Sequence, residues 1–207
     1  MGFFSSLVYR DYRRLWGATA CSQAALWALI VLRGALVYEL TKSNAWVGFI
    51  TMAAHLPSLI VTPFAGFLAR VGDPRRRGQL LLWLGLLSGL TPIVLGFAVT
   101  LHQAMLAVAT VGASTAAFMT LSYGIIQTLA PDGIRGRVMS ANTWHVQGAT
   151  SGFNAINGLL MDVPWMTAPL LLRGTGILFV VVMLSSLLIV HLRSIYARGL
   201  STGALAR

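Results

Sequence analysis

Carboxylates are scarce in this chain, since only 5 of its 207 residues are Asp or Glu, against 15 Lys and Arg, and there is 1 cysteine. With Cys21 alone, no intramolecular disulfide and no cysteine-based redox or zinc motif can form. The sequence also lacks a nucleotide-binding glycine loop, a nucleophile motif and a cluster of metal ligands. It therefore predicts a protein that is not an enzyme and that needs no cofactor or metal.

Charge of either sign is absent from Gly78 to Pro131, and further apolar runs flank this stretch. Charged residues make up 10% of the chain and hydrophobic residues 57%, and the mean hydropathy is +0.76. A soluble globular domain carries about 25% charged residues, so this composition excludes one. A membrane-crossing helix needs about 20 apolar residues. The uncharged stretch therefore predicts two such helices, joined by a turn at Thr100–Gln103.

The same reading along the whole chain predicts an all-α integral membrane bundle of six transmembrane helices. The expected spans are residues 17–38, 45–69, 79–99, 104–129, 141–161 and 174–192. The chain then divides into an interfacial amphipathic helix (1–16), a first three-helix unit (17–101), a second three-helix unit (102–193) and a cytoplasmic tail (194–207).

Arginine is concentrated on one side of this arrangement. Twelve arginines precede the first span or follow the second, fourth and sixth, whereas the opposite loops hold only Lys42 and Arg173. Because Lys and Arg are retained in cytoplasmic loops, both termini are expected in the cytoplasm, in a multi-pass plasma (inner) membrane protein. The net charge of +10 is dispersed between apolar spans, which argues against a nucleic-acid partner and for a lipid bilayer.

The first of two informative cytoplasmic loops follows the second span. Its glycine and charged residues are Gly66, Arg70, Asp73, Arg75, Arg76 and Arg77. With the upstream runs 36–43 (LVYELTKS), 56–57 (LP) and 63–66 (PFAG), this loop resembles the beginning of major facilitator superfamily transporters, in particular the enterobactin and drug exporters. The resemblance implies a cytoplasmic gating loop, and the alternative is simple anchoring by positive charge. The family has an acidic residue where Arg70 stands, for which Asp73 is a partial, shifted substitute.

The second informative loop follows the fourth span and contains Pro131, Asp132, Arg135, Gly136 and Arg137. It resembles the segment between helices ten and eleven of the same exporters. A complete family member has twelve helices, so the resemblance implies half of a major facilitator fold, truncated or internally deleted. The first two or three helices would be joined to the last three. Whether the third span corresponds to the third or the ninth family helix stays open.

The resemblance implies a secondary-active transporter that exports a small amphipathic molecule, such as a siderophore or a drug. Six helices supply one bundle of the two that such a transporter needs, so a homodimer is expected. The alternative is a non-transporting six-helix remnant, or a partner of another membrane protein.

Five polar residues within the spans are candidates for a substrate or proton pathway: Arg33, His55, Gln147, Asn154 and Asn157. A charge inside a span is costly, so Arg33 either extends toward the outer surface or lines a cavity and contacts an anionic substrate. His55 is either a packed hydrogen-bond donor or a proton carrier. The three amides line either a water-filled pathway or a helix–helix contact. Two G-x-x-x-G pairs, Gly85 with Gly89 and Gly148 with Gly152, would permit close helix packing.

Overall fold

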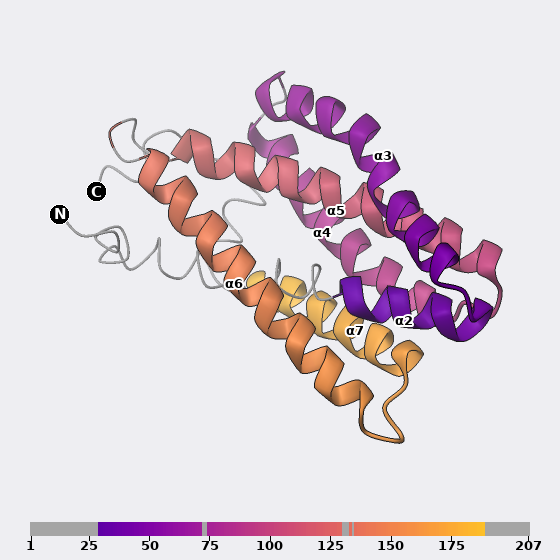
Figure 1. The fold of residues 1–207 in the computed structure, drawn as a ribbon. Coiled ribbons are helices and arrows are strands. Elements are labelled where there is room, and N and C mark those ends of the chain that lie inside the picture. The colour runs from indigo at the N-terminus through magenta and orange to yellow at the C-terminus, as the bar shows by residue number, and fades with distance from the viewer. Residues whose placement is uncertain (1–28, 72–73, 130–132, 134, 189–207) are drawn as a thin grey trace.

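A computed structural model of the chain describes residues 29–71, 74–129, 133 and 135–188, which contain helices and no strand. The helices are α2 (Leu29–Thr41), α3 (Asn44–Val71), α4 (Pro74–Leu95), α5 (Leu101–Leu129), α6 (Arg135–Met161) and α7 (Ala168–Ser186) (Figure 1). The all-α prediction is therefore confirmed for this part of the chain. The predicted interfacial helix (1–16) and cytoplasmic tail (194–207) lie outside it.

Four of these helices, α3, α4, α5 and α7, are long and apolar enough to cross a membrane. The described part of α2 has 13 residues, which is too short to be judged as a span. At 27 residues α6 is long enough, but its polar side chains set it apart from the four apolar helices. The count of six spans and the cytoplasmic location of the termini stay predictions.

The turn between α4 and α5 lies earlier than the sequence predicts. α4 ends at Leu95 and α5 begins at Leu101, so the expected turn residues 101–103 belong to α5. The reason is reciprocal capping at the start of α5. The Gln103 N–H donates to Thr100 Oγ1 (3.3 Å), and the Val99 N–H donates to Gln103 Oε1 (3.1 Å). The predicted unit boundary at 101/102 consequently falls at the start of a helix.

The last helix also begins earlier than predicted, at Ala168 instead of Gly174. Thr167 precedes it in an extended conformation, and proline lies in the first helical turn, where its missing N–H has no cost. Arg173, expected in an outer loop, is therefore part of α7.

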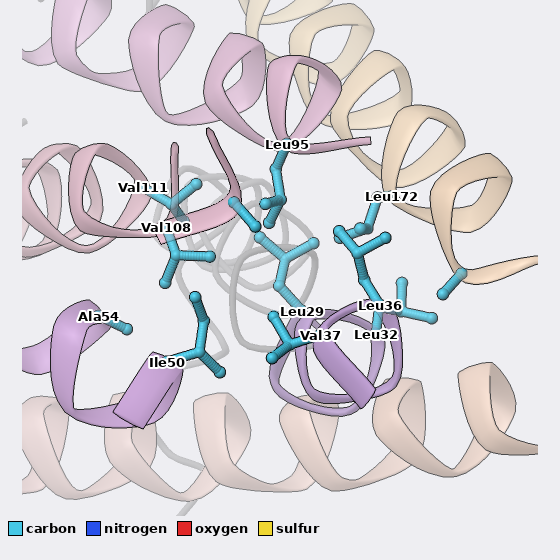
Figure 2. Close-up of a cluster of buried hydrophobic side chains, with 12 residues drawn as sticks. Leu29, Leu32, Leu36, Val37, Ile50, Ala54, Leu95, Val108, Val111 and Leu172 are labelled. Carbon is cyan, nitrogen blue, oxygen red and sulfur yellow. The ribbon is translucent and has the colours of Figure 1, made fainter. Parts of the chain in front are cut away.

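The main apolar core is formed around α2 (Figure 2). Leu29, Leu32, Leu36 and Val37 of this helix pack against buried side chains of four others. These are Ile50 and Ala54 from α3, Leu95 from α4, Ala104, Val108 and Val111 from α5, and Ala168 and Leu172 from α7. Both predicted three-helix units thus contribute to one core, because α3 packs along α5 and α4 packs between α5 and α7.

Two of these helix contacts depend on glycine. A Cβ atom at Gly89 would lie 2.7 Å from side-chain atoms of Phe179 and Val180 in α7. A Cβ atom at Gly112 in α5 would collide with the backbone carbonyl of Ala54 in α3. Small residues let helix backbones approach closely, as predicted for the Gly85–Gly89 pair.

The far edges of the bundle differ in character. α3 lies at one edge, and its outward side chains are large and apolar, including Met52, Leu56, Leu59, Phe64 and Phe67. α6 lies at the opposite edge in Figure 1 and contributes no buried member to the main core. Its packing is chiefly against α2, with a small contact to α5. Both edges expose large apolar side chains, and the α6 edge adds exposed polar and small residues.

Candidate functional site

Arg33 is enclosed in the apolar core. It lies on α2 one turn after Leu29 and close to Leu32 and Leu36, which are all buried, and its own side chain is only 7% exposed. Its Nε atom has no hydrogen-bond partner. Neither of the two carboxylates in the described part of the chain, Glu39 and Asp162, is buried. Arg33 is thus mostly buried, its Nε atom has no partner, and no described carboxylate is buried with it.

α6 is one of the helices that pack against α2, and its Asn154 side chain reaches this contact. Asn154 Oδ1 accepts a hydrogen bond from the backbone N–H of Val31 (3.4 Å), two residues before Arg33. Asn154 Nδ2 in turn donates to the carbonyl of Thr150 one turn back (2.9 Å). Asn157, three residues further on, is 5% exposed. The contact between α6 and α2 therefore includes a hydrogen bond from a side-chain amide to the backbone.

More polar atoms without partners are buried on the inner side of α6. They are Asn142 Nδ2 and Thr150 Oγ1. A buried polar atom that lacks a hydrogen bond costs free energy, so the native structure usually satisfies it with protein, water or ligand. The inner side of α6 therefore holds several buried polar groups, from Asn142, Thr150 and Asn157.

The outer side of α6 is open, and it carries polar and small residues together with the exposed apolar side chains of Trp144, Ile156 and Leu159. Gln147 is exposed, as are Gly148, Ser151 and Gly152. A Cβ atom placed on Gly148 or Gly152 would find no atom within 4 Å. The structure thus separates the three predicted amides: Asn154 and Asn157 lie toward the bundle, and Gln147 lies on the exposed part of the helix.

His55 does not take part in this arrangement. Its side chain is exposed on the outward face of α3, in the same stripe as Met52, Leu56 and Leu59. Its backbone carbonyl accepts a hydrogen bond from the Ser58 hydroxyl, as is common in a helix. The structure places His55 on the apolar edge of the bundle and Arg33 in the core.

The two cytoplasmic loops are described only in part. Gly66 is half-buried in α3, where an added Cβ atom would lie 3.9 Å from Thr120 of α5. Arg76 is exposed near the start of α4, and Gly136 is exposed near the start of α6. The remaining loop residues are outside the description, either entirely or in their side chains: Arg70, Asp73, Arg75, Arg77, Pro131, Asp132, Arg135 and Arg137.

Sequence reasoning missed a buried hydroxyl layer halfway along the helices. Gly85 of α4 lies against Phe118 of α5, and these consecutive helices run in opposite directions. Ser88 is therefore level with Thr115, and the hydroxyl oxygen of each is buried without a hydrogen-bond partner. The sequence signal was a serine or threonine at the middle of each uncharged span.

Arg173 has a structural position that sequence reasoning also missed. Its Nε atom donates to the carbonyl of Gly96 (2.8 Å), and its guanidinium carbon lies 3.9 Å from the centre of the Phe97 ring. Pro169, just inside the start of α7, was the signal that could have placed Arg173 in a helix.

The described residues give no indication of a metal centre, because no three His, Cys, Asp or Glu side chains among them lie close enough to hold an ion. No protein-family model matches this chain, and no curated protein matches it. The polar contact between α2 and α6 is therefore the candidate functional site on its own geometry. The resemblance to exporters stays a prediction.

Proposed function

We propose that the protein is a secondary-active transporter of the plasma (inner) membrane, exporting a small amphipathic molecule and working as a homodimer. The observation that carries this proposal is the nature of α6, a helix of membrane-spanning length that buries polar side chains and packs weakly against the other described helices. The major facilitator resemblance of the sequence supports the same function.

The length of α6 supports a position within the membrane. Its 27 residues extend about 40 Å at 1.5 Å per residue, more than the thickness of a hydrocarbon core. Hydrocarbon cannot satisfy polar side chains such as Gln147 and Asn154, so residues of this kind usually face a bundle interior or a water-filled cavity. A helix with these properties is suited to line a pathway.

The weak packing of α6 supports movement. The helix forms a hydrogen bond with α2 through Asn154, whereas α3, α4, α5 and α7 interlock through large apolar side chains and glycine contacts. Closely packed cores resist deformation. We therefore expect alternating access to involve displacement of α6 relative to α2. This movement would open the buried polar side of α6 to one side of the membrane at a time.

The outer face of α6 supports the homodimer. Gly148 and Gly152 form a G-x-x-x-G pair with open space above both residues, whereas the Gly85–Gly89 pair is already occupied by α7. Residues 140–161 carry no Lys, Arg, Asp or Glu, so two copies can meet there without charge repulsion. Two copies with the same orientation would be related by an axis along the membrane normal, as are the halves of major facilitator transporters.

Flux into vesicles tests the proposal. The purified protein is reconstituted in phosphatidylcholine vesicles with a pH gradient, and two permanently charged fluorescent probes are followed: 2-naphthalenesulfonate and (2-naphthylmethyl)trimethylammonium. We expect gradient-dependent movement of at least one probe. Asn157→Leu should slow the movement of the probe because it removes a buried amide from the inner side of α6. The matched control Thr62→Leu, on the exposed face of α3, should leave it unchanged.

Absence of flux for both probes, together with only monomers after crosslinking in lipid, would overturn the proposal. That result would favour the non-transporting remnant or membrane-partner alternative.

A further inference from the structure

Arg33 is mostly buried, and no described residue pairs with it. An arginine that extends toward the membrane surface keeps its guanidinium group in water and buries only its aliphatic stem. Arg33 is 7% exposed as a whole residue, and its Nε atom is among the fully buried atoms. The terminal guanidinium nitrogens are not among these buried atoms, so the side chain is enclosed as far as Nε while its end can be reached from outside.

A buried cation is normally retained beside an anion or several hydrogen-bond acceptors, because loss of hydration otherwise strongly disfavours it. The described residues form no hydrogen bond or ion pair with Arg33. Glu39, six residues later on the same helix, is exposed, and Asp162, just after α6, is exposed as well. The described part of the chain thus holds a mostly buried arginine without an acidic partner.

The neighbouring helix adds neutral polar groups at the same level. The hydrogen bond from the Val31 N–H to Asn154 fixes this part of α6 beside the part of α2 that carries Arg33. Thr150 Oγ1, one turn before Asn154, is buried and has no partner. A hydroxyl group and amides can donate hydrogen bonds to an anion, while α2 and the core around it supply apolar contacts.

We propose that the Arg33 guanidinium of α2 binds the anionic group of an amphipathic ligand. The ligand class is an organic anion, with a carboxylate, sulfonate or phosphate group attached to an apolar body. Guanidinium forms its strongest hydrogen bonds with such groups. This assignment deepens the transport proposal and relies on it for the meaning of the site, but the binding itself can be measured without transport.

Binding to the protein in nanodiscs of phosphatidylcholine alone tests this site, because this neutral lipid supplies no competing anionic headgroup. The two naphthyl probes share their aromatic body and differ in the sign of their charge. We expect the wild-type protein to bind 2-naphthalenesulfonate about 30-fold more tightly than (2-naphthylmethyl)trimethylammonium, the difference expected for one charge-assisted hydrogen bond. Empty nanodiscs provide the correction for partition into lipid.

Variants locate the preference. Arg33→Gln should abolish it, and Arg33→Lys should retain part of it because the charge remains. Lys42→Gln is the matched control, since it removes one exposed positive charge nine residues further along and should leave the preference unchanged. A thermal midpoint no lower than that of the wild type shows that each variant is folded.

Equal affinity of the wild type for both probes would overturn the site, as would an unchanged preference in Arg33→Gln. Arg33-dependent binding without flux of either probe would leave the site standing and remove the transport proposal. Flux of both probes without a charge preference in binding would support the transport proposal and overturn the Arg33 site.

Discussion

Arg33 and the glycines are the residues whose roles depend most on their surroundings. A buried charge without a partner lowers stability, and its replacement by an apolar residue of similar volume often raises it by about 1–4 kcal/mol. Arg33 is mostly buried beside buried leucines of α2 and has an unpartnered Nε atom. The residue is thus placed where it reduces stability, as is common for groups retained for binding.

We therefore predict that Arg33→Leu stabilises the protein and removes its preference for anionic probes. The expected gain is about 2 kcal/mol in the free energy of unfolding, because an uncompensated buried charge is removed. Denaturant titration in detergent micelles measures it. A clear loss of stability would show that Arg33 is instead held by an interaction that supports the fold.

The glycines predict opposite effects at two helix positions. Gly112→Ala should destabilise the protein by about 2 kcal/mol, because the new methyl group meets the backbone carbonyl of Ala54, which can move only with α3. Gly148→Ala, with open space around it, is the matched control and should leave the unfolding of the monomer unchanged. Thermal unfolding of both variants in detergent distinguishes them. Equal destabilisation would contradict the α3–α5 contact.

At the scale of the helices, the contact between α4 and α7 is fixed at one end by Arg173. Its side chain hydrogen-bonds the Gly96 carbonyl just beyond the end of α4 and stacks over Phe97. A cation near the C-terminus of a helix is favoured by the helix dipole and by the carbonyl groups left without partners there. Arg173 therefore joins the start of one helix to the end of another.

Arg173→Ala should lower the free energy of unfolding by about 2 kcal/mol, through loss of a charged hydrogen bond and a cation–π contact. Lys42→Ala is the matched control, since Lys42 also lies over an aromatic ring, that of Tyr38, but is exposed at 5.9 Å from the ring centre. Denaturant titration should show a change below about 0.5 kcal/mol for the control. Similar losses in both variants would contradict a specific role for Arg173.

The helices also show where sequence patterns were sufficient. Uncharged runs of about 20 residues located α3, α4, α5 and α7, because a span must be apolar whatever it packs against. The errors were at helix ends. The sequence Thr100-Leu101-His102-Gln103 was read as a turn, although its first and last residues form a capping pair that begins α5. Pro169 similarly places the start of α7 before Arg173.

For the whole molecule, the two edges of the bundle have different surroundings. The exposed apolar side chains of α3 suit lipid, whereas the outer face of α6 combines Trp144, Ile156 and Leu159 with small residues that would let another helix approach closely. In a dimer with twofold symmetry, the same face of each copy meets at the axis. Residues near the middle of the outer face of α6 should then lie close to their own counterparts in the second copy.

Cysteine crosslinking in vesicles measures this arrangement. In a Cys21→Ala background, Ser151→Cys should form disulfide-linked dimers on oxidation, because Ser151 lies between Gly148 and Gly152 on the exposed face. Thr62→Cys on the exposed face of α3 is the matched control and should remain monomeric. Crosslinking by the α3 variant and not by the α6 variant would place the dimer contact on the other edge of the bundle.

The sequence by itself determined that this chain is helical and apolar enough for a membrane, because hydrophobicity and span length are properties of the residues alone. It also identified Arg33, Asn154 and Asn157 as polar residues in unfavourable surroundings. Only the tertiary structure decided that Arg33 is enclosed, that one G-x-x-x-G pair is occupied and that the other is open. Helices that are apolar on every side carry no mark of which face meets which partner, so these outcomes depend on how the helices pack.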